Sequence, residues 1–221
     1  MERSIINEGF PLQARAAVVV AHPDDEILWC GGLILAHPQW HWHIVTLCRA
    51  DDPDRAPKFN KVLEALHAEG RMGGLDDEPA QDPLAPSSVG ETVLRLLPDK
   101  PFDLIVTHGP RGEYTRHRRH EECCRAVARL WEEGRIRTQQ LWFFAYDDGG
   151  RAFLPRASIG AHHQIDLPDH EWREKHRLIT DVYGFQPDSW EARTTPRHEG
   201  FWCFRSPQSA MDFIQSNPPP P

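Results

Sequence analysis

Short apolar runs alternate with stretches of helical character along the first 150 residues of this chain. Runs that are apolar throughout and rich in β-branched residues are typical of strands buried on both faces of a sheet. This criterion predicts four strands, at residues 16–21, 42–48, 102–108 and 141–146. The helices predicted between them lie at roughly residues 26–37, 57–70, 87–97 and 119–133. The alternation predicts an α/β fold with a mostly parallel sheet and helices on both faces.

The pattern changes after residue 150, and the chain ends in a proline-rich segment. Further elements are predicted as follows: a strand and then a helix starting near Pro168 within residues 162–183, a last strand at 200–206, and a surface loop at 73–88. A chain of 221 residues fits one domain. We therefore predict a single domain over residues 1–215 and a disordered or extended tail over residues 216–221.

Charge and cysteine content narrow the class of protein. The formal net charge is −8, whereas a protein that binds duplex nucleic acid needs a broad basic face. The five cysteines show no C-x-x-C spacing, so reduced thiols are expected. The N-terminal sequence lacks a secretory signal pattern, and no apolar run approaches the roughly 20 residues of a spanning helix. These features predict a cytoplasmic protein with no nucleic-acid partner and no transmembrane segment. They leave the formation of a homo-oligomer open.

The sequence AHPDDE places one histidine and three carboxylates directly after the first predicted strand. These residues are His22, Asp24, Asp25 and Glu26. Like charges a few ångströms apart raise one another's pKa, so adjacent acids are unfavourable unless a cation lies among them. The simpler alternative is that Asp24 or Asp25 caps the following helix, but a cap explains only one of the acids. We therefore predict a divalent metal ion at this strand end.

A metal site also needs a ligand from elsewhere in the chain. His22 and Asp25 lie three residues apart and can both point at one ion. A catalytic zinc site usually has three protein ligands and one open position for water. The segment from His117 to His120, which follows a predicted strand, is the best source of the third ligand. Asp24 would then lie beside the bound water, where a carboxylate can act as general base.

These motifs resemble the PIG-L/LmbE-like family of metal-dependent N-acetylglucosaminyl deacetylases. The resemblance covers about residues 15–190 and is strongest at residues 18–32 and 102–124, which contain AHPDDE, the GG that follows it, and the distal H-x-x-H. It implies a Rossmann-like α/β domain and a hydrolase that removes the N-acetyl group from an N-acetylglucosamine-type substrate. Such a substrate is a glycolipid, a glycoside or a thiol-precursor conjugate. The resemblance also implies Zn²⁺ as the cofactor, with Fe²⁺ or another divalent ion as the alternative.

The resemblance further implies a role for each residue of the two motifs. The zinc ligands would be His22, Asp25 and His120, and Asp24 would be the general base. His117 would hydrogen-bond the developing oxyanion or protonate the leaving amine.

The chain departs from the family pattern between the two distal histidines. Relatives commonly carry Pro-Asp there, whereas this chain has Arg118 and Arg119. An acid at that place can orient the first histidine, which is His117 here. Glu113 and Glu121 are the candidates for a substitute acid.

Substrate-binding residues match the family pattern only in part. Relatives often carry Arg and then Glu at the start of the second helix, and the nearest matches here are Lys58 and Lys61. Tyr114 stands one residue further from the first distal histidine than the tyrosine of relatives does. Asp76 or Asp77, in the following loop, would meet sugar hydroxyls. The candidate substrate-binding residues are therefore Lys58, Asp77 and Tyr114.

Two alternatives to this function stay open. A metal-dependent amidase that cleaves a larger conjugate would use the same constellation of residues. The other alternative is a sugar-binding protein whose catalytic residues have decayed. Intact Asp24 and His117 count against this alternative.

Overall fold

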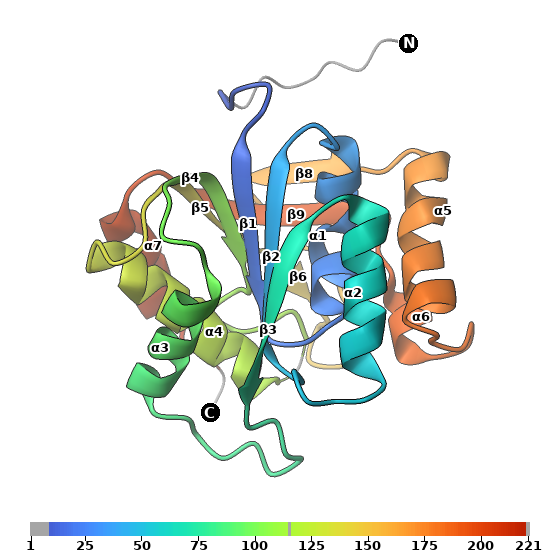
Figure 1. The fold of residues 1–221 in the computed structure, drawn as a ribbon, viewed down its shortest axis with the longest axis horizontal. Coiled ribbons are helices and arrows are strands. Elements are labelled where there is room, and N and C mark those ends of the chain that lie inside the picture. Colours follow the sequence, from blue (N-terminus) through green and yellow to red (C-terminus); the bar gives the residue numbers. More distant parts are fainter. Residues whose placement is uncertain (1–8, 115, 220–221) are drawn as a thin grey trace.

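A seven-stranded sheet forms the centre of the computed structural model, which describes residues 9–114 and 116–219 (Figure 1). The strand order is β3-β2-β1-β4-β5-β9-β8. Pairing is parallel from β3 to β5, and β9 runs antiparallel to both β5 and β8. The strands of this sheet are β1 (Arg15–Val20), β2 (His41–Cys48), β3 (Glu69–Leu75), β4 (Phe102–Thr107), β5 (Thr138–Phe144), β8 (His163–Asp166) and β9 (His198–Phe204). A separate small hairpin is formed by β6 (Tyr146–Asp147) and β7 (Arg156–Ala157).

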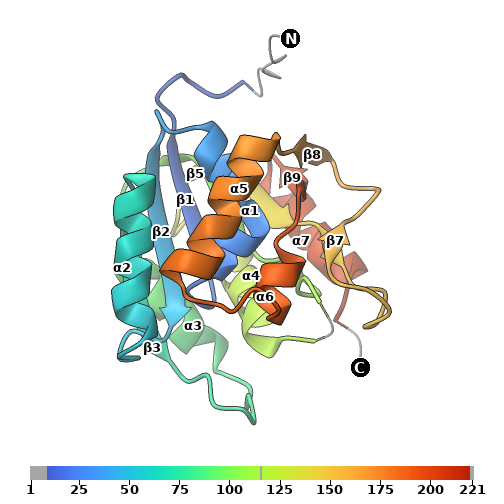
Figure 2. The same ribbon diagram turned by 90° about the vertical axis from the view of Figure 1, so that its right-hand side faces the viewer.

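Helices cover both faces of the sheet, as Figures 1 and 2 show. Helices α1 and α2 pack on one face, with α5 packed against α1, and α3, α4 and α7 pack on the other face. The helices are α1 (Asp25–Ala36), α2 (Arg55–Leu66), α3 (Pro86–Leu96), α4 (Arg118–Glu132), α5 (Asp169–Arg177), the π-helix η1 (Leu178–Val182), α6 (Trp190–Thr194) and α7 (Pro207–Ser216). The predicted α/β fold, with a mostly parallel sheet between two helical layers, is confirmed.

The central strand β1 shows why an uninterrupted apolar run predicts a buried parallel strand. Successive side chains of a strand point to opposite faces. Val18 and Val20 enter the core beneath α1 and α2, whereas Ala17 and Val19 enter the core beneath α3 and α4. All four side chains are fully buried. Both faces of β1 must therefore be apolar.

The edge strand β3 was not predicted, because its sequence lacks an apolar pattern. Residues up to 70 were assigned to a helix and residues 73–88 to a loop, but α2 ends at Leu66 and residues 69–75 pair with β2. The segment is rich in glycine, which allows close approach of the backbones. A Cβ atom on Gly70 would lie 2.5 Å from the carbonyl oxygen of Ile44. The pairing therefore depends on the absence of a side chain.

Elements after β5 were predicted only in part. The strand β8, the helix α5 following Pro168, and the strand β9 lie where the sequence indicated. The hairpin β6–β7, the π-helix and α7 were not predicted. The described chain continues past the end of α7 to residue 219, and the last two residues of the tail expected at 216–221 lie outside the described residues. The tail and the domain limits stay predictions.

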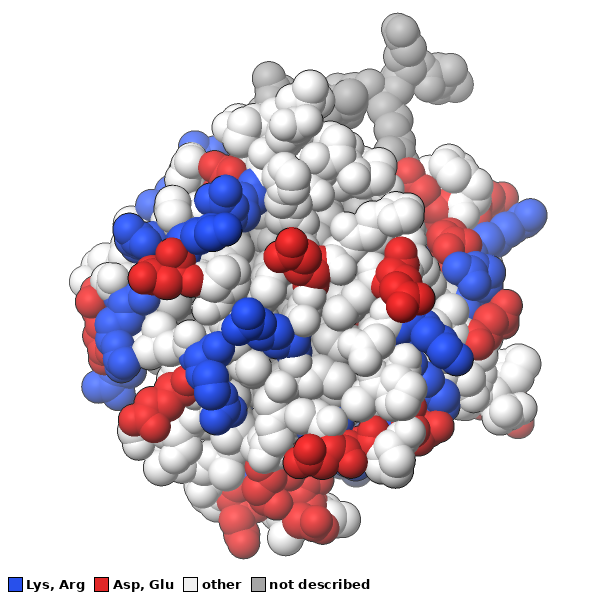
Figure 3. All heavy atoms as spheres, in the orientation of Figure 1, with Lys and Arg blue, Asp and Glu red and all other residues white. Residues whose placement is uncertain are grey.

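The strand order places a topological switch point beside β1. The chain proceeds from β1 to β2 and β3 on one side, and then crosses to β4 on the other side of β1. Ligands of open α/β sheets bind beyond the carboxyl ends of the strands at such a point. Among the described residues, no helix has the length and apolar character needed to cross a membrane. On the face drawn in Figure 3, basic side chains are interspersed with acidic ones, and acidic side chains gather at the lower end.

Candidate metal centre

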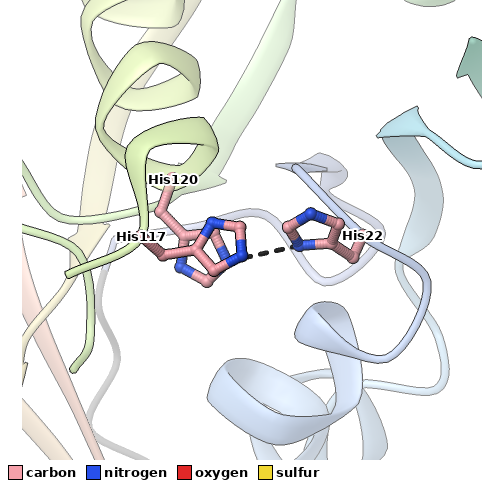
Figure 4. A group of neighbouring side chains, drawn as sticks. All are labelled: His22, His117 and His120. Atoms are coloured by element: carbon pink, nitrogen blue, oxygen red, sulfur yellow. Dashed lines mark hydrogen bonds between the residues drawn. The ribbon is translucent and has the colours of Figure 1, made fainter. Parts of the chain in front are cut away.

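The two sequence motifs meet at the carboxyl ends of β1 and β4. His22 and Asp25 lie in the turn between β1 and α1, and His120 lies in the first turn of α4. Figure 4 shows the imidazole of His22 facing those of His117 and His120, which come from a segment nearly 100 residues further along the chain. A cleft of about 230 Å³ opens over them. The residues lining it are His22, Pro23, Asp24, Asp25, Leu28, Arg49, Arg55, Asp77, Tyr114, His117, Trp190 and Glu191.

Three potential ligand atoms form a nearly equilateral triangle beneath this cleft. Nδ1 of His22 lies 3.1 Å from Oδ2 of Asp25 and 3.3 Å from Nε2 of His120. The remaining side, between Oδ2 of Asp25 and Nε2 of His120, is 3.4 Å. Atoms bound to one tetrahedral ion at about 2.0–2.2 Å lie about 3.3–3.6 Å apart. The donor set therefore fits a zinc-sized divalent ion.

Hydrogen bonds on the outer side of each group orient these atoms. Nε2 of His22 donates to Oδ1 of Asp77 at 3.0 Å, so the lone pair of this ring is on Nδ1. Nδ1 of His120 donates to Oε2 of Glu113 at 2.6 Å, which leaves the lone pair on Nε2. The indole of Trp29 donates to Oδ1 of Asp25 at 3.0 Å. Outer partners of this kind hold metal ligands in place.

Burial and neighbouring charges shift the pKa values of these crowded groups. Burial disfavours a charged ring, but hydrogen bonds to Asp25 and Asp77 outweigh it and raise the pKa of His22 to about 9. Burial opposes ionisation of Glu113 as well, yet the charges of His108 and His120 lower its pKa to about 2. An additional proton on His22 and an ionised Glu113 are therefore favoured. This is the distribution expected where a cation belongs.

His108 is a member of this cluster that the sequence did not single out. Its ring is fully buried and stacks on His120, with centroids 3.8 Å apart. Nδ1 of His108 donates to Oε2 of Glu113 at 2.8 Å, and Nε2 accepts the backbone N–H of Ala21 at 3.0 Å. Nε2 also lies 3.5 Å from Asp25. The only sequence signal was its place at the end of a predicted strand.

Three further sets of side chains could hold an ion here. They are Asp25 with His108 and His120, His22 with His117 and His120, and His22 with Cys48 and Asp77. In the first set, the lone pair of His108 Nε2 already accepts the amide of Ala21. The set of His22, Asp25 and His120 places its three ligand atoms within 3.1–3.4 Å of one another, so its geometry favours it.

Asp24 occupies a strained position at the start of α1. Its φ is 122°, a backbone angle that residues other than glycine rarely adopt. Strained backbone of this kind is concentrated at functional sites. Its backbone N–H donates to Oε2 of Glu26 at 3.0 Å, and Glu26 in turn accepts from the hydroxyl of Tyr183. Its carboxylate pairs with Arg55 at 3.2 Å. Burial and the charge of Asp25 raise the pKa of Asp24 well above its usual value.

His117 lies beside the triangle and is stacked on His120, with ring centroids 4.3 Å apart. Neither candidate acid contacts it, because Glu113 binds His108 and His120 while Glu121 pairs with Arg116. Its contact is instead with a neutral amide: Nε2 of His117 lies 3.1 Å from Nε2 of Gln81. Burial and the charges of His120 and His22 lower the pKa of His117 to about 3.

The candidate substrate residues differ in their distance from the cleft. Asp77 and Tyr114 line it. Lys58 does not line it, and its ammonium group pairs with Asp54 at 2.7 Å. Arg55, almost one turn earlier, is the basic residue of α2 that lines the cleft, and Arg49 lines it from outside that helix. The sequence did not distinguish Arg55 from the lysines, because the first residue of a helix is difficult to locate from sequence alone.

Comparisons with known proteins agree with this arrangement. The crystal structure of the conserved protein TT1542 from Thermus thermophilus superposes with a TM-score of 0.59 at 18% identity, over 86% of this chain and 94% of that chain. At that identity the likeness establishes a shared fold. The uncharacterized protein L374 of Acanthamoeba polyphaga mimivirus is 22% identical over 158 residues, which are 65% of this chain and 67% of the relative.

A family model gives the assignment. The model described as PIG-L, GlcNAc-PI de-N-acetylase, matches residues 17–131, which include both motifs and all three atoms of the triangle. That span is more than half of the chain. The chain therefore belongs to the PIG-L family.

Proposed function

We propose that this protein is a zinc-dependent hydrolase that removes the acetyl group from an N-acetylglucosamine-type substrate. Family membership supports a deacetylase-type hydrolase in general. The observation that carries the finer proposal is the triangle of His22, Asp25 and His120, whose sides of 3.1–3.4 Å match a tetrahedral zinc site. Asp24 lies beside this triangle in the wall of the cleft. Fe²⁺ is the alternative ion.

The residues around the triangle would divide the work of amide hydrolysis. When bound, zinc would polarise the amide carbonyl and lower the pKa of a water molecule. Asp24 takes the proton from that water as its oxygen bonds to the carbonyl carbon. His117 donates a hydrogen bond to the carbonyl oxygen as negative charge develops on it. The C–N bond then breaks, and a proton passes to the amine so that acetate and the free amino sugar leave.

The cleft offers groups suited to a sugar. Tyr114 and Trp190 meet edge to face at its mouth, with ring centroids 4.8 Å apart, and apolar faces of sugars pack on such rings. Arg55 and Asp77 supply charged hydrogen-bonding groups beside them. We propose these four residues as substrate contacts. Lys58 stays a weaker proposal, because its charge is already paired with Asp54.

One observation favours the alternative of a larger conjugate. A second cavity, of about 420 Å³, is lined by residues 109–114 and has Tyr114 in common with the cleft. Its walls include Trp202, Asp147 and Arg111. Cavities that bind small molecules commonly measure about 300–1,000 Å³. A substrate with a bulky group beyond the amino sugar would use both spaces.

We propose the cytoplasm as the location of this protein.

A panel of N-acetylated amino sugars and their glycosides tests the proposal. With zinc present we expect release of acetate and free amine from at least one compound, and loss of that release with a chelator. Asp24→Asn should abolish turnover and retain zinc, whereas His120→Ala should lose zinc. Binding without acetate release from any compound would instead favour the non-catalytic sugar-binding protein. Full activity of Asp24→Asn would refute the role of Asp24 as base.

A further inference from the structure

The loop between β3 and α3, residues 76–85, brings a side chain to each of two histidines of the cleft. Asp77 accepts from Nε2 of His22 at 3.0 Å, and the amide of Gln81 lies 3.1 Å from Nε2 of His117. Gln81 has a φ of 46°, in the left-handed region that residues with side chains seldom occupy. Strained residues persist only where their surroundings hold them. Contacts that fix this loop are therefore expected.

Arg119 supplies most of those contacts. Its side chain is 2% exposed. It donates from Nε to the carbonyl oxygen of Asp76 at 2.5 Å, and from NH2 to the carboxylate of Asp76 at 3.1 Å and the carbonyl of Asp82 at 3.0 Å. Glu122 holds the guanidinium at 2.7 Å and accepts the N–H of Leu84 at 3.0 Å. The first turn of α4 therefore grips the loop on both sides of Gln81.

The orientation of the Gln81 amide determines which nitrogen of His117 carries the proton. Oε1 of Gln81 accepts the backbone N–H of Arg118 at 3.1 Å, so its NH₂ group faces His117. An NH₂ group can only donate, and Nε2 of His117 must therefore be the acceptor. The ring proton is left on Nδ1. This atom is buried and has no hydrogen-bond partner among the residues that the structure describes.

We propose that Arg119 and Gln81 are positioning residues for His117. Arg119 fixes the 76–85 loop on α4, and Gln81 holds the imidazole with its proton on Nδ1. A neutral amide from a distant loop thus orients the histidine. The proposal rests on the proposed function in one respect: the buried Nδ1 proton would become the hydrogen-bond donor to the amide oxygen once a substrate is bound.

The tautomer of His117 tests the contact without reference to activity. Correlation spectra of protein labelled with ¹⁵N-histidine distinguish Nδ1–H from Nε2–H, and His117→Asn identifies the signals. In the wild type, before and after zinc is added, we expect a proton on Nδ1 and none on Nε2. Gln81→Glu keeps the side-chain length but presents an acceptor, so Nε2 should gain a proton. A protonated Nε2 in the wild type, or no change in Gln81→Glu, would overturn the proposal.

Kinetics then separate the two positioning residues. Gln81→Leu should lower kcat by about 10- to 100-fold, the usual effect of losing an outer hydrogen-bond partner, with KM and zinc affinity unchanged. Arg119→Met should lower kcat and also weaken zinc binding, because the freed loop carries Asp77. Arg129→Met is the matched control, since this side chain on α4 is 65% exposed, and it should change neither quantity.

The outcomes distinguish this proposal from the proposed function. If no substrate is deacetylated by the wild type, the hydrolase is refuted, while the tautomer measurement still decides the contact. If the wild type is active and Gln81→Leu keeps its kcat, the positioning role is refuted while the hydrolase stands. If Arg119→Met fails to fold, the two Gln81 variants decide the proposal.

Discussion

Each of the two ring nitrogens of His22 contacts a carboxylate. Asp77 binds its outer nitrogen, and Asp25 lies 3.1 Å from its inner nitrogen. The contact with Asp77 leaves the lone pair of Nδ1 available to an ion. The contact with Asp25 stabilises a proton on that same nitrogen when no ion is bound. Metal and proton therefore compete for the same nitrogen.

Zinc affinity should consequently rise with pH. The pKa of His22 is about 9 in the absence of metal, because hydrogen bonds to Asp25 and Asp77 outweigh the effect of burial. Below that pH zinc must displace a proton, so the affinity should increase at least about tenfold per pH unit between pH 6 and 8, and level off above about 9.

Competition with a chelator of known affinity measures this dependence. Asp77→Asn provides the comparison, since loss of that carboxylate should move the dependence to lower pH. An affinity that stays constant between pH 6 and 8 would contradict the assignment of His22 as a ligand.

The helix α1 is broken just after the residues that it contributes to the cleft. Cys30 has non-helical angles, φ −143° and ψ 19°. The break frees the N–H groups of Gly32 and Leu33, which donate to the two carboxylate oxygens of Glu199 at 2.6 and 2.8 Å. Lys175 pairs with the same carboxylate at 2.7 Å. A Cβ atom on Gly32 would lie 2.1 Å from a Leu167 methyl group, which explains the glycine.

Removing this cap should destabilise the fold. Lys175 and Glu199 are both fully buried, so Glu199→Gln leaves a buried charge without its partner and presents an NH₂ group to a backbone donor. Loss of one partner of a buried pair costs about 3–5 kcal/mol of the free energy of unfolding. Urea denaturation of the zinc-free protein measures it. Lys175→Met added to Glu199→Gln should recover part of the loss, and a neutral single variant would show that the pair contributes little.

The strands and helices also show which elements can be predicted from the sequence. β1 and β4 were predictable because burial on both faces demands apolar residues at every position. β3 was not, because glycines permit its pairing and leave no apolar pattern. The break in α1 was equally hidden, since its cap comes from Glu199, far along the chain. Features that depend on one distant side chain have no local signal.

The candidate site follows the same division. AHPDDE and H-x-x-H identified residues that are adjacent in sequence, and the fold brings their atoms within 3.4 Å. Gln81 was missed as the partner of His117, and Glu113 was a candidate partner of His117 but bonds His108 and His120 instead. Both roles arise from loops whose path the sequence does not specify. Arg55 was missed by a shift of less than one helical turn from Lys58.

At the scale of the whole molecule, the centre joins segments that only the folded chain brings together. His22 follows β1 and His120 begins α4, with β2, α2, β3, α3 and β4 between them. An unfolded chain cannot present this set of ligands. Zinc binding should therefore stabilise the native state alone.

We expect zinc to raise the melting temperature. At 100 times its dissociation constant, a ligand that binds only the native state contributes about 2.7 kcal/mol. For a chain of this size that corresponds to a shift of about 5–10 °C. Thermal unfolding followed by circular dichroism, with and without zinc, measures the shift. His120→Ala should show none, and an equal shift in that variant would place the ion elsewhere.

The bond from the amide of Ala21 to the ring of His108 connects this centre with the sheet itself. The last paired residues of β1 and β4 are Val19 and Thr107, and this bond joins the chain two residues beyond the first to the residue directly after the second. The imidazole thus extends the ladder of hydrogen bonds past the end of both strands. Because alternate residues face opposite sides, sliding β4 by one position would turn His108 toward the wrong helical layer. The register between the two central strands therefore also determines the direction in which the ion-binding groups point.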